Sequence, residues 1–537
     1  MIGSVFFWLA PLLSAGAFYL AFNLHPGSWG WAFIAWLPLL ALAERSGSRR
    51  SALGLGLLAG FSFNFIELFW ITNSIAGFTS LPHLAVNLIM ALLALYLGLY
   101  YALFSGLWHY LRNLPGKGSG FAEAAGALTL AAVWILLEDL RSSLLGGFPW
   151  HPLGLTQLEN HYLNWLLPWG GVRLLSGLIM LGNAGLFLSL NAIFAKNLKK
   201  AALHVFFLLG PLLALALFAG SHAPVKTDSY LASSTPKAPN AISVAVIQPN
   251  IPQKDKWLPE NREIIIAKMI AMTQQSLDAK PDLIVWPEAA LPLLLEREET
   301  LNDRLQELVN QHHTGLMLGG PRYVAEPPAN LQAESRKKLY NAIFLFTPKN
   351  PVQIYNKIKL VPYGEFTPLA EFFPFISKIV PGLDYSAGSK IKNLALKNLK
   401  IAPSVCFEGV FPAFTARFFG AGANFLANLT NDAWFGDSPG PRQHLLNIRL
   451  RALENNCFIV RCANTGISAI INPQGKIEQQ LPLNQEGIIA ARVSPVTNPT
   501  FFARHPDLTT IVAGFIALAS LLIIFFCRSR AGLKGNS

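Results

Sequence analysis

The sequence predicts a polytopic α-helical membrane domain combined with an α/β domain outside the membrane. Seven apolar stretches lie within residues 1–220, and several approach the roughly 20 residues that a helix needs to cross a bilayer. An eighth stretch, 508–527, contains no charged residue. From residue 241, apolar strand-like segments alternate with amphipathic helical ones, which is the pattern of an α/β domain.

The membrane domain is expected over residues 1–220, with seven transmembrane helices, and the eighth helix over 508–527. The seven apolar cores are 4–23, 28–43, 52–71, 84–108, 124–140, 174–194 and 201–219. The first lacks the basic residues that precede the apolar core of a signal peptide, so we favour a retained helix over a cleaved leader. Glu67 lies inside the third. Ionisable residues within spans often mark function, and the sequence offers no partner for this one.

Basic residues in the loops predict the orientation of this domain. If the eight stretches alternate, Arg141 and Arg173 fall on one side of the membrane and eleven basic residues fall on the other. These eleven are Arg45, Arg49, Arg50, Arg112, Lys117, Lys196, Lys199, Lys200, Arg528, Arg530 and Lys534. Because basic loops stay in the cytoplasm, both termini and the tail 528–537 are expected there. The α/β domain is then periplasmic, and the protein is expected to be a multi-pass protein of the inner (cytoplasmic) membrane.

Charge and cysteine content argue against two other classes of protein. The net charge of +12 divides into +4 over residues 1–220, +5 over 221–508 and +3 over the last 29 residues. A balance of +5 without a basic run does not indicate nucleic-acid binding. Four cysteines in 537 residues do not make a disulfide framework.

The α/β domain is expected over residues 241–505, after a polar, proline-rich linker at 221–240. The expected strands are 242–248, 282–286, 315–319, 340–347, 352–356, 399–405, 424–430, 458–463, 467–472 and 487–493. The expected helices are 260–278, 298–313, 409–420 and 441–455.

Three polar residues in this domain are candidates for catalysis: Glu288, Lys357 and Cys406. Glu288 follows an apolar strand and Pro287, which stops regular strand pairing. Cys406 also ends an apolar strand and precedes a helical segment, a turn that exposes a nucleophile. A thiolate can attack an acyl group, a carboxylate can remove the thiol proton, and an ammonium can stabilise the oxyanion. The three groups together predict chemistry through a thioester.

The neighbours of these residues resemble the apolipoprotein N-acyltransferase branch of the nitrilase (carbon–nitrogen hydrolase) superfamily. The matching fragments are Val285–Glu288, Tyr355–Glu365 and Val405–Glu408, and the flanking membrane segments narrow the resemblance to this branch. The resemblance implies a nitrilase-like αββα sandwich in which the three candidates are catalytic. Lys359 would share a face with Lys357 in a continued strand, but Lys357 holds the motif position.

The resemblance also implies residues that support these three. Glu365 would position Lys357, and Glu408 lies beside the nucleophile in sequence. Phe407 stands where the family usually has a tyrosine, so the ring is kept and the hydroxyl is absent. Any role of that hydroxyl is therefore in doubt in this chain.

Two outer segments resemble family loops, Asn250–Trp257 near the acyl donor and Asn431–Gly436 as pocket wall and loop support. They make Trp257, Asn431 and Trp434 candidate substrate-binding residues. Trp257 could equally be a core or interface aromatic.

Two further segments bear on the site. The apolar, proline-interrupted segment 366–385 is either a lid that dips into the bilayer surface or a loop packed onto the domain. Residues 147–154 also resemble the family and are expected to shape the junction between the two domains. No constellation of metal ligands and no phosphate-binding glycine motif is visible in the sequence, so no metal and no cofactor is expected.

The function that the resemblance implies is N-acyl transfer. A fatty-acyl chain would move from a membrane phospholipid, through a Cys406 thioester, to the N-terminal amine of the diacylglyceryl-cysteine of an apolipoprotein, the last step of lipoprotein maturation. The partners would be the phospholipid donor and the diacylated apolipoprotein, and we expect a monomer. One alternative is a membrane-tethered amidase or nitrilase that uses water as acceptor. The other is a non-catalytic membrane protein that binds lipids or lipoproteins.

Overall fold

The computed structural model describes residues 2–23, 25, 27–113, 120–210, 213–215, 241–325, 337–368 and 384–534. The chain divides into two compact units. The helical unit is Met1–Ser142, Pro149–Pro224 and Asp507–Ser537, and the α/β unit is Ser143–Phe148 and Val225–Pro506. The short segment Ser143–Phe148 therefore belongs to the α/β unit although it lies within the first 220 residues.

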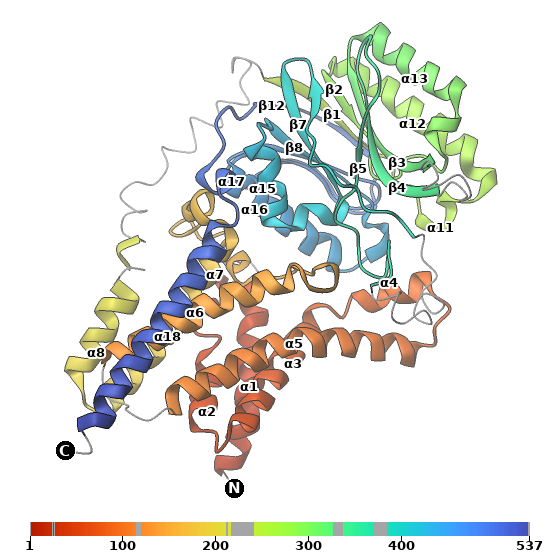
Figure 1. Ribbon diagram of the computed structural model, residues 1–537. Coiled ribbons are helices and arrows are strands. Elements are labelled where there is room, and N and C mark those ends of the chain that lie inside the picture. Colours follow the sequence, from red (N-terminus) through yellow and green to blue (C-terminus); the bar gives the residue numbers. More distant parts are fainter. Residues whose placement is uncertain are drawn as a thin grey trace, which may run out of the picture. The chain divides into compact units, whose positions relative to one another are not determined.

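The helical unit gathers two parts of the chain that lie far apart in the sequence (Figure 1). Its helices are α1 (Ile2–Phe22), α2 (Leu37–Arg45), α3 (Arg49–Glu67), α4 (Ile71–Phe78), α5 (His83–Asn113), α6 (Gly120–Arg141), α7 (Leu167–Phe194), α8 (Leu198–His204) and α18 (Leu508–Lys534). In the part of the chain that the structure describes, four helices are long and apolar enough to cross a membrane. They are α5, α6, α18 and the helix that contains α7, and the pair α3–α4 makes a fifth if it counts as one span.

Three of the expected stretches are not single straight helices. The stretch 28–43 forms a 3₁₀ helix, Ser28–Phe33, and then α2, which starts where Pro38 cannot donate a backbone hydrogen bond. The stretch 52–71 breaks after Glu67, and α3 and α4 meet at a bend of 59°. The stretch 201–219 is described only in part, as the end of α8 and a π-helical turn, Val205–Leu209.

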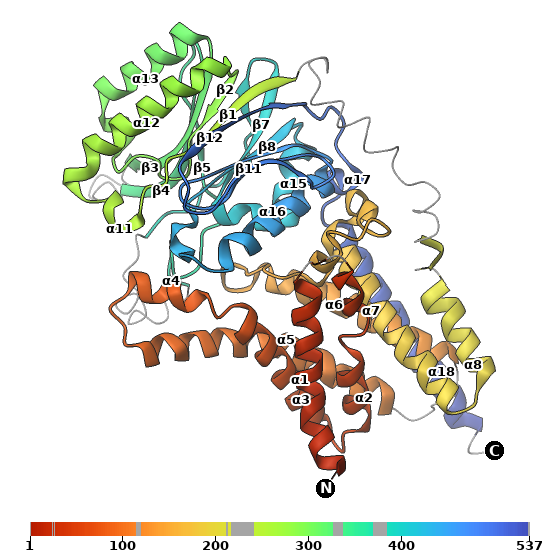
Figure 2. The same ribbon diagram turned by 180° about the vertical axis from the view of Figure 1, so that it is seen from behind.

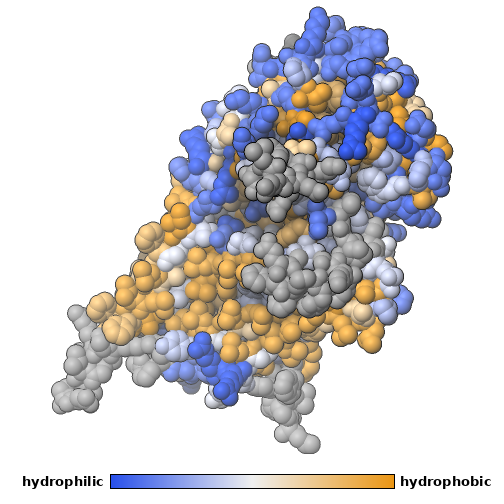
Figure 3. All heavy atoms as spheres, turned by 45° about the vertical axis from the view of Figure 1, so that its right-hand side comes forward, coloured by the Kyte–Doolittle hydropathy of each residue, from blue (hydrophilic) through white to orange (hydrophobic). Residues whose placement is uncertain are grey.

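Glu67 is thus the last residue of α3 and does not lie inside a continuous span, which corrects the sequence interpretation. The structure also gives it a neighbour, because the Nε2 atom of His151 lies 3.8 Å from the Glu67 carboxylate. The surface of the helical unit fits a bilayer environment. Figure 3 shows hydrophobic side chains over much of its visible face, and α5 exposes Leu84, Leu88 and Leu92 one turn apart.

The α/β unit contains two six-stranded sheets among the described residues. The first has the order β12-β1-β2-β3-β4-β5 and the second β11-β10-β9-β8-β7-β6. The strands of the first are β1 (Ile242–Gln248), β2 (Leu283–Val285), β3 (Gly315–Ala325), β4 (Lys337–Phe346), β5 (Gln353–Asn356) and β12 (Gly487–Val493). Those of the second are β6 (Leu394–Leu396), β7 (Leu399–Val405), β8 (Phe425–Thr430), β9 (Ile459–Ala463), β10 (Ser468–Ile471) and β11 (Ile477–Leu481).

The two sheets lie face to face between two layers of helices, as Figures 1 and 2 show. Helices α12 (Arg262–Ser276) and α13 (Glu299–His312) cover the first sheet, and α15 (Pro412–Gly420) and α16 (Gly440–Asn455) cover the second. The Cys462 thiol lies 3.3 Å from the carbonyl oxygens of Ile247 and Val285, so β9 touches β1 and β2 across the interface. This arrangement confirms the nitrilase-like αββα sandwich.

The expected strands are present, with a few differences in the details. β3 runs on to Ala325, and the short β6 and the partly exposed β11 were not expected. The expected helix 409–420 is a 3₁₀ helix, Cys406–Val410, followed by α15, because Pro412 opens a new helix. The linker 221–240 lies outside the described residues.

Candidate active site

Glu288 lies just beyond β2, and its carboxylate is buried and held at both oxygens. The Asn341 side-chain amide donates to Oε1 at 2.7 Å, and the Asn431 backbone N–H donates to Oε2 at 2.8 Å. The turn that carries Glu288 approaches β3 so closely that a Cβ on Gly319 would lie 2.7 Å from the Glu288 Cα atom. Only glycine fits there without a shift of the turn.

Lys357 follows β5 directly, and its ammonium is buried between two carboxylates. Its Nζ atom lies 2.9 Å from Oε1 and 2.8 Å from Oε2 of Glu365, and 3.7 Å from Oε1 of Glu288. Burial lowers the pKa of Lys357, but Glu365 and Glu288 outweigh it, so the pKa is raised and the group is charged. Lys359 is placed differently, with Nζ 5.2 Å from the centre of the Phe411 ring.

Asn341, in the middle of β4, joins the two carboxylates of this cluster. Its amide nitrogen donates to Oε1 of Glu288 at 2.7 Å and to Oε1 of Glu365 at 2.8 Å. An amide nitrogen has two hydrogens, and here both are used. The sequence interpretation missed this residue, although a polar side chain inside an otherwise apolar strand is a signal that deserved weight.

Cys406 is the residue at which β7 ends and the 3₁₀ helix begins, and its backbone has φ +49°. That left-handed conformation is uncommon for a residue with a Cβ atom and turns the side chain out of the strand. Burial and the charges of Glu288 and Asp432 raise the pKa of the Cys406 thiol, while Lys357 and Thr430 lower it by less. The resting cysteine is therefore a thiol, and a nearby base must take its proton.

The Glu408 carboxylate accepts hydrogen bonds from backbone N–H groups of two separate segments. Its carboxylate accepts the N–H groups of Ile358 at 2.6 Å, Lys359 at 3.1 Å and Val405 at 2.9 Å, and the hydroxyl of Tyr355 at 2.8 Å. Burial raises the pKa of Glu408 to about 6, against these hydrogen bonds. The side chain ties the segment after β5, which carries the lysine, to the end of β7, which carries the cysteine.

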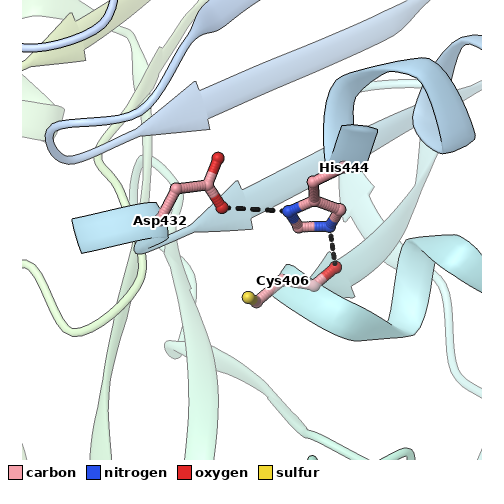
Figure 4. Close-up of side chains that lie close together, drawn as sticks. All are labelled: Cys406, Asp432 and His444. Atoms are coloured by element: carbon pink, nitrogen blue, oxygen red, sulfur yellow. Dashed lines mark hydrogen bonds and ion pairs between the residues drawn. The ribbon is translucent and has the colours of Figure 1, made fainter. Parts of the chain in front are cut away.

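A second buried network lies under the carbonyl group of Cys406. His444 of α16 places Nε2 3.2 Å from that carbonyl oxygen and Nδ1 2.9 Å from Asp432 (Figure 4). Asp432 also lies 2.6 Å from the guanidinium of Arg461. Cys406, Asp432 and His444 offer ligand atoms within 4.8 Å of one another, but the Arg461 cation already neutralises the carboxylate. The geometry is that of a hydrogen-bond network and does not fit a metal centre.

Phe407, beside the nucleophile, packs between aromatic rings. Its ring centre lies 5.2 Å from that of Phe411 and 6.5 Å from that of Phe148. Phe148 belongs to the short segment that joins the α/β unit. Phe148, from the segment expected to shape the domain junction, thus lies near the residue that follows the nucleophile.

The three candidate substrate-binding residues fall into two groups. Trp257 and Trp434 are 45% and 40% exposed, so each presents a large apolar ring to its surroundings. Asn431 is buried, and besides holding Glu288 it donates from its amide to the Gln253 side chain at 2.7 Å. The structure therefore places Asn431 as a support of Glu288. Most of the expected lid, residues 369–383, lies outside the described residues.

Known proteins are similar to both parts of this chain. A family model described as carbon–nitrogen hydrolase matches residues 243–498, and one described as the apolipoprotein N-acyltransferase N-terminal domain matches residues 14–185. The apolipoprotein N-acyltransferase of Geobacter metallireducens is 33% identical over 96% of this chain and 95% of its own length. The chain belongs to the apolipoprotein N-acyltransferase family.

Other similar proteins include the apolipoprotein N-acyltransferase of Azotobacter vinelandii, which is 35% identical over 87% of this chain and 86% of its own length. Among solved structures, Nit3 of Saccharomyces cerevisiae, from branch 10 of the nitrilase superfamily, aligns with 48% of this chain and 90% of its own. Its sequence identity is 20% and its TM-score is 0.36.

Proposed function

We propose that this protein moves a fatty-acyl chain from a membrane phospholipid to the N-terminal amine of a diacylated apolipoprotein, through a thioester on Cys406. The observation that carries the proposal is the buried pair in which the Lys357 ammonium lies 3.7 Å from the Glu288 carboxylate. Glu408 bonds the N–H groups of Ile358 and Val405 and so joins this pair to the turn that carries the Cys406 thiol. The chain's membership of the apolipoprotein N-acyltransferase family supports the apolipoprotein acceptor, and a phospholipid is the acyl donor that we propose. The residue roles below are part of the proposal.

In the first half-reaction, the Cys406 sulfur attacks the carbonyl carbon of a phospholipid ester. Glu288 accepts the thiol proton as the C–S bond forms. The ammonium of Lys357 and backbone N–H groups at the start of the 3₁₀ helix stabilise the oxyanion. Collapse of this intermediate expels a lysophospholipid alkoxide, which takes the proton from Glu288, and leaves the acyl group as a thioester.

In the second half-reaction, the free α-amine of the acceptor's diacylglyceryl-cysteine attacks the thioester carbonyl. Glu288 takes a proton from this amine, the C–S bond breaks, and the proton returns to the Cys406 sulfur. The product is an amide on a triacylated lipoprotein. Amines attack thioesters readily, and a site that excludes water favours transfer over hydrolysis.

The membrane arrangement belongs to the same proposal. We place eight spans in residues 1–220 and 508–527, both termini in the cytoplasm and residues 241–505 in the periplasm of a cell with an inner membrane. The loop charges support this orientation, and the long apolar helices support membrane insertion. One chain carries the whole catalytic cluster, which supports a monomer as the working form. In this arrangement the exposed rings of Trp257 and Trp434 would contact lipid substrates.

A membrane-tethered amidase with water as acceptor is the second candidate, because the cluster itself is compatible with either acceptor. The test is intact-protein mass spectrometry of the purified full-length enzyme in phospholipid, without acceptor. We expect a fatty-acyl adduct that hydroxylamine removes and that the Cys406→Ala variant lacks. Free fatty acid released without an adduct would support transfer to water in place of an amine, and the absence of both products would overturn the proposed acyl transfer.

A further inference from the structure

The backbone of the proposed nucleophile is held by two side chains from different elements. The Cys406 carbonyl oxygen accepts a hydrogen bond from the Asn428 amide of β8 at 3.2 Å and lies 3.2 Å from Nε2 of His444 on α16. The left-handed φ of Cys406, +49°, is unfavourable for a residue that is not glycine, because its Cβ atom crowds the backbone. Such a conformation persists only where the surroundings enforce it.

Both side chains are in turn fixed by one buried cation, the Arg461 guanidinium of β9. One of its terminal nitrogens donates to the Asn428 amide oxygen, and the other lies 2.6 Å from Asp432, which lies 2.9 Å from Nδ1 of His444. The guanidinium is thus connected to the Cys406 carbonyl in two ways, through Asn428 and through His444. The residues of these two connections are at most 1% exposed.

The positions of the hydrogens follow from the partners. A carbonyl oxygen only accepts, so Nε2 of His444 must carry a hydrogen to bond it. Nδ1 of the neutral ring is then an acceptor, and the Arg461 guanidinium, 3.2 Å away, donates to it. The guanidinium only donates, so it selects the oxygen of the Asn428 amide and turns the nitrogen toward Cys406. Burial raises the pKa of Asp432, but the Arg461 cation outweighs it and the pKa is lowered to about 2, so the carboxylate is ionised.

Stability alone is a poor reason for such a network. Removing ionised groups from water is expensive, and apolar side chains of similar volume are often equally stabilising. A network that ends on one carbonyl oxygen instead imposes one backbone geometry. Here that geometry sets the direction of the Cys406 sulfur and of the N–H groups that follow it.

We propose that His444 is a positioning residue for acyl loading: with Asn428, it clamps the Cys406 carbonyl and holds the nucleophile in its left-handed turn. Figure 4 shows the side chain of His444 between Asp432 and that carbonyl group, with the sulfur of Cys406 directed elsewhere. His444 acts through the backbone and does not touch the reacting atoms. The inference rests on the proposed function, in which Cys406 is the nucleophile.

The test compares His444→Gln with His444→Met in the full-length enzyme in phospholipid. The two side chains are similar in size, but only glutamine can donate a hydrogen bond to the carbonyl. Leu450→Ala, a buried position on the same helix, is the control for a loss of packing alone. For each variant we would measure the melting temperature, the single-turnover rate of acyl loading against phospholipid concentration, and the rate of Cys406 alkylation by iodoacetamide.

We expect His444→Met to load acyl groups about 10- to 100-fold more slowly at saturating phospholipid, because a small displacement of a reacting group lowers a rate by about that much. The phospholipid concentration that gives half of the maximal loading rate should be unchanged. His444→Gln should recover a large part of the rate, and alkylation should follow the same order. Leu450→Ala should lower the melting temperature and leave both rates unchanged. The proposal would be overturned if His444→Met loaded acyl groups at the wild-type rate, or if His444→Met and His444→Gln lost the same part of that rate. If the wild type never loads acyl groups, the proposed function fails, and the alkylation rates still decide whether His444 positions Cys406.

Discussion

The two sheets of the α/β unit contribute to the site in different ways. Elements at the end of the first sheet supply charges that face the reaction, Glu288 and Lys357. Asn341 lies between the carboxylates of Glu288 and Glu365. The second sheet supplies Cys406, and its own buried ion pair, Asp432–Arg461, leads to the carbonyl side of that residue.

This difference shows two uses of buried charge within one fold. On the first sheet, charge sets protonation states, because the thiol has a raised pKa and needs a base and a cation nearby. On the second sheet, charge sets geometry by ordering hydrogen bonds around a strained turn. Changes to Glu288 and its partners should therefore alter the pH dependence, whereas changes to the hydrogen bonds on the Cys406 carbonyl should mainly alter the rate.

The largest effect is expected for the single reacting atom of the second sheet. Cys406→Ala should lose acyl loading and transfer altogether, and Cys406→Ser should lose about 10³-fold or more, because a serine hydroxyl is far less ionised than a thiol. Loading by mass spectrometry and transfer to a diacylated lipopeptide would be measured side by side. Substantial turnover by the alanine variant would remove Cys406 as nucleophile.

The second-largest effect is expected for Glu288, the proposed general base at the end of the first sheet. Burial, the largest cause, and Glu365 raise the pKa of Glu288 above its usual 4.5, against the effect of Lys357. Below that pKa the carboxyl is protonated and cannot take the thiol proton, so wild-type loading should fall as the pH decreases through a value above 4.5.

Glu288→Gln cannot accept a proton at any pH. We expect the rate of acyl loading to fall by about 10²- to 10⁴-fold. The residual rate should no longer decrease at low pH, so the acid limb of the pH profile should be absent. The measurement is the pH profile of single-turnover loading, with the surface variant Glu296→Gln as control. A Glu288→Gln enzyme that keeps the wild-type acid limb would assign that limb to another group.

Asn341 tests whether the first sheet depends on more than its charges. Asn341→Ala removes one donor from each of two buried carboxylates, which keep their bonds to Asn431 and to Lys357. Hydrogen bonds to charged groups contribute about 1.5–3 kcal/mol, so we expect loading to fall about 10- to 100-fold. Asn341→Asp should be worse, because it adds a like charge between Glu288 and Glu365. Asn350→Ala, at an exposed position, is the control and should load acyl groups at the wild-type rate. A small effect of Asn341→Asp would show that the cluster holds an extra proton.

The sequence predicted those parts of this site that depend on local order. Glu288 and Cys406 stand where apolar strands end, and such positions can be recognised without knowledge of the fold. Lys357 needed the resemblance of its neighbours, since nothing local separates it from Lys359. The sandwich followed from the alternation of strands and helices together with that resemblance.

The rest depended on contacts between distant residues. Asn341 and His444 lie inside a strand and a helix, and their importance comes from partners 53 and 38 positions away. The bend after Glu67 and the break before Pro38 lie within apolar stretches and do not change their composition. The apolar stretches therefore predicted where the helical unit lies in the sequence, but not where its helices break.

The smallest effect is expected at Phe407, which belongs to the second sheet but to neither network. Phe407→Tyr adds one hydroxyl to a buried ring packed against Phe411 and Phe148. Because the ring shape is kept, we expect acyl loading within about threefold of the wild type and a change of stability of about 1 kcal/mol or less. Loading rate and melting temperature would be compared with those of Phe418→Tyr, a buried ring on α15. If Phe407→Tyr alone slows loading strongly, the ring beside the nucleophile must be apolar in this chain, and the second sheet would control the polarity of the site as well as its geometry.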